Sequence, residues 1–471
     1  MRQSAALLLL VLVVGTAVGF AQSPSALAET KLSPAERNMA RAKHLIEKNP
    51  KDFEVYNALA LALSRRARET SEVTFYTQAE EALQKSFTIS PDNLDGQRIH
   101  VWVLLGKHEF ASALDVAKKL NQKMPDDVMV YGFLTDANVE LGNYPSAEAA
   151  AQWMLDLKPG NIPGLTRAAY LRELFGDIDG ALDLMNMAYQ STPPSEVEDA
   201  AWIVTQMAHL KLVIGKIDEA EKLSQQALVM FPGYHYALGN LAKVRIQQKR
   251  YNEAVQLLTQ RYQAAPHAES LFDLAQALHL AGQTEEANKA FAEFEQKSLL
   301  ETNRADNSNH ELISYYADYA NQPARALEVA KRELARRHDV FTLDCYAWAL
   351  HVNGQNEEAY RQINTALAIG IRDARILRHA GEIALAVPGR SAAESNRRQS
   401  AERNALGSEQ ARALAQSAND NEKQHGTTVP EKPGFSMLRN RAMPDHRSIF
   451  RIGPEADVVG GGTWLSHDLT C

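Results

Sequence analysis

The chain has 471 residues, of which 45% are hydrophobic and 23% charged, and its formal net charge is −8. This composition is typical of a folded protein, and the length exceeds what one ordinary hydrophobic core can bury unless the chain is built by repetition. The mild negative charge argues against nucleic acid as a partner, because such partners need Lys and Arg concentrated on one face.

The first residues have the pattern of a secretory signal peptide, which we expect over residues 1–21. Arg2 supplies the positive charge, an uninterrupted apolar run follows, and small residues then lead to a cleavage site after Ala21 or as late as Ala28. An uncleaved membrane anchor is the alternative, although the apolar run is short for a span of ~20 residues. The sequence therefore predicts an exported protein, periplasmic or secreted, with no stable membrane span after cleavage.

A single helix is predicted over residues 33–50. Ser33 and Glu36 have the spacing of a capping box, Pro34 takes the first helical position, and Pro50 ends the helix. A lone helix before the first repeat would cover the exposed end of a helical stack, as terminal units must.

A small residue then recurs at intervals of 33, 34 or 39 residues, and in six units a proline follows it twelve residues later. A fixed period of this length is the sequence signature of a repeat architecture. The ten positions are Ala79, Ala113, Ala147, Ala181, Ala220, Ala254, Ala287, Ala326, Ala359 and Ala393.

Each unit is predicted to be a pair of helices. Apolar residues spaced by three and four indicate helix, a turn such as Gly142-Asn143-Tyr144 separates two of them, and Pro159 ends the second. We expect the two helices to approach most closely at the recurring alanine. The two longer intervals predict insertions near residues 195–196 and 303–309.

The pattern resembles the tetratricopeptide repeat family. The likeness is carried by the small residue, the closing proline and an aromatic or aliphatic residue three positions before the small one. The aromatic or aliphatic residue is present in five units, as Phe110, Tyr144, Ile178, Ile217 and Tyr251. The resemblance implies an all-α fold, a right-handed superhelical solenoid of antiparallel helix pairs, with about ten repeats over residues 52–416. It also implies a concave groove that binds peptides or protein surfaces. Residues 417–471 lack any period, and we interpret them as a disordered tail.

The chain carries no HExxH, GxSxG, CxxC or phosphate-loop motif, and its 14 histidines are scattered. We therefore predict no enzymatic activity, no cofactor and no metal. Only Cys345 and Cys471 are present, so disulfide bonds are not the main source of stability. Cys345 is expected in the core.

The family register places outward-facing residues of the first helices in the groove. Trp348 is the predicted anchor, because an exposed Trp buries a large area when a partner binds. The positions that clamp a peptide carboxylate in some relatives are not matched, so that mode of binding is not expected. The ten residues of the predicted surface are Asp136, Tyr170, Thr205, His209, Lys243, Gln276, Asp344, Trp348, Arg378 and Glu382.

Two functions stay open at this point. The first is a scaffold of the cell envelope that binds a segment of a protein partner in the groove. The second is recognition of a glycan or other envelope polymer along the same groove, by stacking on Tyr170 and Trp348. The sequence names no partner and does not determine the oligomeric state.

Overall fold

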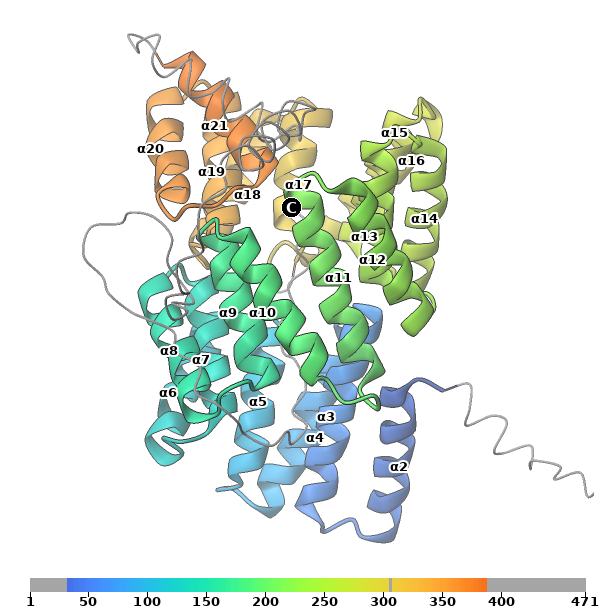
Figure 1. Ribbon diagram of the computed structural model, residues 1–471, viewed down its shortest axis with the longest axis vertical. Helices are drawn as coiled ribbons and strands as arrows, with labels where there is room; N and C mark the ends of the chain where they lie inside the picture. Colours follow the sequence, from blue (N-terminus) through green and yellow to red (C-terminus); the bar gives the residue numbers. More distant parts are fainter. Residues whose placement is uncertain (1–31, 305–306, 388–471) are drawn as a thin grey trace, which may run out of the picture.

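The computed structural model describes residues 32–304 and 307–387. Over these residues the chain is helical without any strand, and the helices stack into a curved array (Figure 1). The expected signal peptide, the last repeat beyond residue 387 and the expected tail lie outside the described residues. No helix in the described part of the chain is long and apolar enough to cross a membrane.

Successive helices form antiparallel pairs, preceded by the single helix α2 (Pro34–Lys48) and followed by α21 (Ala374–Ala386). This arrangement confirms the predicted fold class, a right-handed superhelical solenoid of antiparallel helix pairs. The pairs are α3–α4 (Phe53–Thr70, Thr74–Ile89), α5–α6 (Leu94–Gly106, Phe110–Lys123), α7–α8 (Val128–Glu140, Tyr144–Leu157), α9–α10 (Ile162–Leu174, Ile178–Ser191), α11–α12 (Val197–Val213, Ile217–Met230), α13–α14 (His235–Gln247, Tyr251–Ala264), α15–α16 (Ala268–Leu280, Thr284–Glu301), α17 and η1 with α18 (Asn309–Ser314, Tyr315–Tyr319, Pro323–Leu334), and α19–α20 (Val340–Val352, Asn356–Leu367).

Local sequence signals begin and end these helices as expected. The hydroxyl of Ser33 accepts a hydrogen bond from the Glu36 amide, and the Glu36 carboxylate accepts one from the Ser33 amide, which completes the capping box of α2. Between the helices of a pair, Gly142 has φ +74°, the left-handed conformation that Gly adopts most readily.

The recurring alanines are buried. Each of the nine alanines within the described residues, from Ala79 to Ala359, is only 0–1% exposed. A larger side chain at such a position would separate the paired helices, because protein cores have no spare volume.

One repeat departs from the pattern, in the longer interval between Ala287 and Ala326. Its first helix, α17, has only six residues and continues as the π-helical segment η1, after which Asn321 takes φ +51°. π-helical turns are rare and are often found at functional sites. The irregular backbone matters here because it carries Asp318 and Tyr319.

The array also closes upon itself through contacts between distant repeats. The carbonyl oxygen of Arg68 in α3 lies 3.1 Å from Nε2 of His235 in α13, and the guanidinium of Arg68 pairs with Asp199 of α11 at 2.7 Å. Farther along, the turn at Gly142 contacts the α18–α19 loop, and the turn at Gly176 contacts the α20–α21 loop. Extensive packing, by contrast, joins only helices that are neighbours in the array.

Candidate binding surface on the first helices

Eight of the ten residues of the predicted surface lie on first helices of pairs, from α7 to α19, and Arg378 and Glu382 lie on α21, which follows the last described pair. Side-chain contacts spaced by about one repeat connect several of these helices. Glu173 of α9 contacts His209 of α11, and Asn240 of α13 donates to the carbonyl oxygen of Thr205 in α11. The first helices therefore form a continuous row.

Exposure of the row was predicted, and for half of the ten residues this prediction is wrong. Trp348 is only 6% exposed: its ring stacks on His379 at 4.1 Å between centroids, and its indole nitrogen donates to Asp318 at 2.8 Å. The reason is that neighbouring first helices pack so closely that residues between them bond to each other. The five buried residues are Asp136, Tyr170, Thr205, Asp344 and Trp348.

Asp136 is half of a buried ion pair with Arg167 of α9, which is 1% exposed. The carboxylate accepts from Nε and Nη2 of Arg167 at 2.8 and 2.5 Å, and the guanidinium also donates to the carbonyl oxygens of Gly132 and Pro163. A bidentate pair with this many further hydrogen bonds fixes α7 against α9.

In three other residues of the predicted surface, partial or complete burial affects the pKa or the hydrogen bonding of the side chain. Burial raises the pKa of Tyr170 well above its usual value, and the nearby Glu140 adds to the shift. Thr205 donates to the carbonyl oxygen of Ala201 within its own helix. Burial also lowers the pKa of Lys243, because its ammonium is costly to desolvate.

A cleft opens between the middle and the end of the array. Glu173 and His209, 2.7 Å apart, form one side of it, and Phe341 at the start of α19 with residues 371–373 forms the other. Its volume is about 360 Å³, including space open to solvent, and Ile178, Val213 and Ile371 contribute apolar side chains to its lining. Of the ten residues of the predicted surface, His209 is the one that lines this cleft.

The last third of the row carries a different surface, which we call the aromatic–histidine band. Its members form an unbroken chain of contacts from α15 to α21: Gln276 and His279 touch Tyr319, Asp318 bonds to Trp348, Trp348 stacks with His351 and His379, and Arg378 lies over Trp348 and pairs with Glu382.

Part of the band is accessible. Tyr319 is 37% exposed, and His279, Asp318 and Arg378 are exposed as well. Beneath the band, buried Asp344 accepts a hydrogen bond from Nδ1 of His379 at 2.8 Å and fixes that ring. The π-helical segment turns Asp318 toward Trp348 and its neighbour Tyr319 toward Gln276.

Sequence reasoning found Gln276, Trp348, Arg378 and Glu382 of this band. It missed His279, Asp318, Tyr319, His351 and His379. The longer repeat interval was the available signal, but it was interpreted as an insertion near residues 303–309. A π-helical turn has no clear sequence signature.

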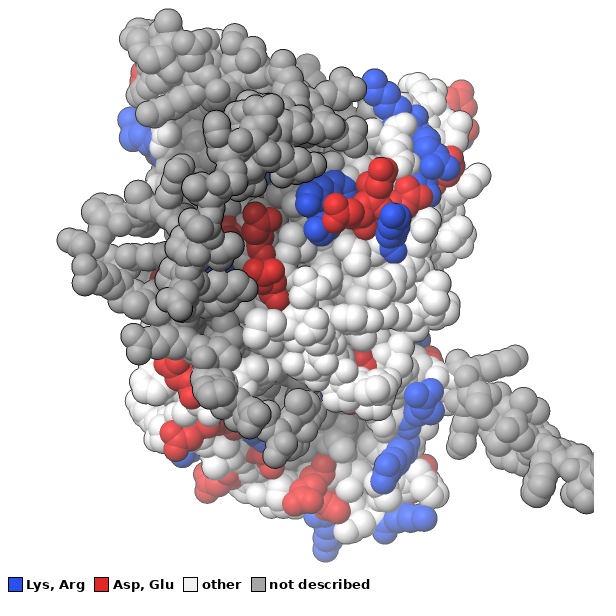
Figure 2. Space-filling model, in the orientation of Figure 1, with Lys and Arg blue, Asp and Glu red and all other residues white. Residues whose placement is uncertain are grey.

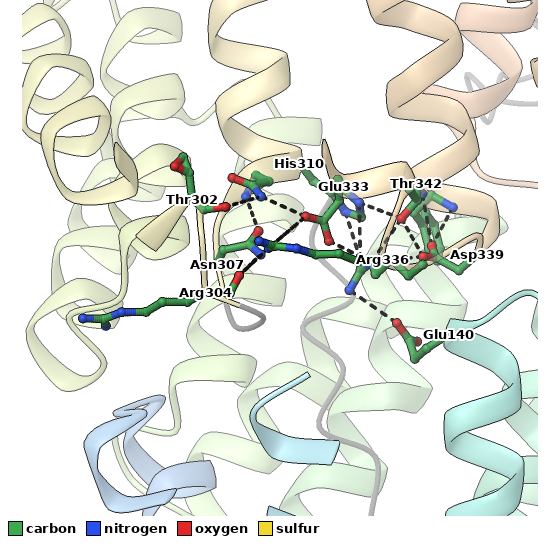
Figure 3. A network of polar contacts seen from close by, with 12 residues as sticks. Glu140, Thr302, Arg304, Asn307, His310, Glu333, Arg336, Asp339 and Thr342 are labelled. Carbon is green, nitrogen blue, oxygen red and sulfur yellow. Dashed lines mark hydrogen bonds and ion pairs between the residues drawn. The ribbon is translucent and has the colours of Figure 1, made fainter. Parts of the chain in front are cut away.

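A separate network of polar contacts surrounds the α18–α19 loop (Figure 3). Arg337 contacts His310, Glu333 and Asp339 on its own side, and Glu140 of α7 from the other side at 3.3 Å. Figure 3 shows Glu140 reaching across from α7 toward this loop.

The face drawn in Figure 2 carries Lys, Arg, Asp and Glu in small mixed groups around an uncharged area. Within the residues that the structure describes, no group of three or more His, Cys, Asp or Glu side chains is placed to hold a metal ion. Cys345 is a buried free thiol, in agreement with its predicted place in the core.

Comparison with known proteins agrees with the repeat pattern. Residues 215–266, around α12 to α14, match the family model described as tetratricopeptide repeat. A TPR repeat-containing protein of Methanocaldococcus jannaschii is 29% identical over 157 residues, which are 33% of this chain and 26% of the relative. The match thus spans about a quarter of that relative's length. Together these findings support the resemblance to the tetratricopeptide repeat family.

Several solved structures are similar at low sequence identity. The APC/C hetero-tetramer Cut9–Hcn1 has a TM-score of 0.47 at 16% identity, covering 68% of this chain and 60% of that one. The human IFIT1 dimer with PPP-AAAA has a TM-score of 0.43 at 12% identity, covering 72% and 95%. PilW, a type IV pilus biogenesis factor, has a TM-score of 0.38 at 11% identity, covering 44% and 93%.

Proposed function

We propose that this protein is a non-catalytic scaffold that binds a segment of a protein partner along the aromatic–histidine band of α15 to α21. The observation that carries the proposal is the chain of contacts from Gln276 to Glu382, which leaves Tyr319 and Arg378 exposed.

The composition of the band suits a protein interface. Tyr, Trp and Arg are the residues most enriched among those that dominate binding energy, and such residues work best when a rigid surface holds them. Here the exposed ring of Tyr319 packs on Phe291 at 4.6 Å, and Arg378 is held over Trp348 at 5.4 Å. Both groups are thus ordered before a partner arrives, which lowers the entropy cost of binding.

We place this scaffold in the cell envelope, as a periplasmic or secreted protein. Support for this part comes from the amino-acid pattern of residues 1–21 alone, which has the order of charge, apolar run and small residues of a signal peptide.

The glycan alternative required Tyr170 and Trp348 as stacking platforms. Both rings are buried, so neither offers a face on which a sugar could stack. We therefore do not carry this alternative further.

The test is capture of partners from envelope extract by the immobilised protein. Native protein is compared with the double variant Tyr319→Ala, Arg378→Ala. The matched control is Trp153→Ala, Arg361→Ala, which removes a 53% exposed Trp and an exposed Arg paired with Glu358, both outside the band.

We expect the same proteins to be retained by the native chain and by the control, and to be lost from the band variant. Equal retention by the band variant and the control would overturn the assignment of binding to this band.

A further inference from the structure

The α18–α19 loop joins two parts of the array that share no extensive helix packing. Residues 335–339 lead directly into α19, and they contact the turn between α7 and α8, which lies about 200 residues earlier. Figure 1 shows α19 to α21 standing above α7 to α10. The contacts between these two parts are therefore made by loops and turns, here and again where the turn at Gly176 meets the loop at Gly370.

Three polar contacts hold the loop to the turn. The amide of His338 donates to the carbonyl oxygen of Glu140 at 3.2 Å, and the amide of Val340 donates to the hydroxyl of Tyr144 at 3.0 Å. The guanidinium of Arg337 pairs with the Glu140 carboxylate at 3.3 Å. Each contact stabilises the closed arrangement only modestly, because its groups bond to water when it breaks.

The fit between loop and turn depends on Gly142. A Cβ atom built at this residue would lie 2.6 Å from the carbonyl oxygen of His338, so the turn can approach the loop only without a side chain. The neighbouring turn repeats this feature, because a Cβ atom at Gly176 would lie 2.5 Å from the carbonyl oxygen of Gly370. Two turn glycines thus serve the long-range contact in addition to their own turns.

The loop side of the contact is held in place independently of α7. Arg337 also contacts Asp339 at 3.1 Å, and Asp339 caps α19 by accepting from the amides of Phe341 and Thr342 (Figure 3). If the contact with Glu140 broke, the loop and α19 would keep these bonds. The turn would also keep its own left-handed Gly142.

We propose that residues 335–340 form a latch, which closes the superhelix on the α7–α8 turn and opens without unfolding either part. The cleft between Glu173 and His209 on one side and Phe341 on the other lies between the latched parts. Opening of the latch widens this cleft and shifts α19, with Trp348 of the band, relative to α9.

Amide hydrogen exchange in the full-length protein tests the latch directly, because the amides of His338 and Val340 donate across it. The variant is Glu140→Gln, Tyr144→Phe, which keeps the size of both side chains. It removes the charge that pairs with Arg337 and the hydroxyl that accepts from Val340.

The matched control is Glu295→Gln, Tyr316→Phe. It makes the same two kinds of substitution at a contact between neighbouring repeats, where the Tyr316 hydroxyl donates to Glu295 and Arg325 pairs with Glu295.

We expect exchange at His338 and Val340 to rise at least about tenfold in the latch variant and to stay near the native rate in the control. Amides inside α9 and α15 should keep their native rates in the latch variant, and its radius of gyration from small-angle scattering should increase.

Native exchange rates at the two amides of the latch variant would overturn the proposal. So would a parallel rise at every amide of the array, because the contact would then be part of the global fold. If the double variant does not fold, Tyr144→Phe alone gives the same two outcomes at His338, because the acceptor of that amide is the backbone carbonyl of Glu140, which the substitution leaves in place.

Discussion

The buried pair of Asp136 and Arg167 offers a sharp test of how the first helices are joined. We consider Asp136→Ala, which removes the carboxylate and leaves the guanidinium of Arg167, 1% exposed, without its bidentate partner. Breaking a buried ion pair from one side costs about 3–5 kcal/mol, because the remaining charge stays desolvated. The carbonyl oxygens of Gly132 and Pro163 still accept from Arg167, so the lower end of this interval is expected.

Replacement of both partners behaves differently. In Asp136→Leu, Arg167→Met no charge remains between α7 and α9, and the volume of the pair is largely kept. Apolar replacement of a whole buried pair is often neutral or stabilising. The double variant should therefore be more stable than Asp136→Ala by about 2 kcal/mol or more.

Urea denaturation followed by circular dichroism, for the two single variants and the double one, gives the coupling between the partners. Hydrogen exchange at amides of α7 and α9 shows whether the loss is local, since repeat arrays need not unfold in one step. If Asp136→Ala changed the free energy of unfolding by less than about 1 kcal/mol, the pair would not be desolvated as its burial indicates.

Three further results are expected. Ala220→Leu should cost about 1–3 kcal/mol in thermal melts, because Ala220 is 0% exposed and a larger side chain would overpack the core; no loss would contradict its tight packing. Burial, with the nearby Arg337, lowers the pKa of His310 well below 6.5, so the unfolded chain binds more protons just below pH 6.5. The free energy of unfolding should thus fall as the pH drops below about 6.5, by up to about 1.4 kcal/mol per pH unit for this one group. Melts at pH 7 and pH 5 should show that His310→Gln removes this contribution to the pH dependence. Asp339→Ala should cost about 1–2 kcal/mol through the lost cap of α19, and Asp339→Asn should recover most of it in the same melts.

The repeat architecture could be predicted from the sequence because its causes are local. The alanine at each helix crossing, the glycine of each turn and the capping residues act within one repeat, so their period predicts the helices and their pairing. The prediction that first helices carry the candidate surface rests on the same period, and eight of the ten chosen residues do lie on first helices of the described pairs.

Exposure of those residues depended on contacts between repeats, which a period does not contain. Trp348 is buried because His379, one repeat later, stacks on it and Asp318, one repeat earlier, accepts from it. The contact of Tyr319 with Gln276, and the latch contact between Glu140 and Arg337, likewise join residues that are far apart in the sequence. The sequence by itself thus determined the repeat, since that is a matter of short-range packing volume. Only the tertiary structure decided which side chains of the row stay accessible, because the curvature of the whole array sets the distances between its repeats.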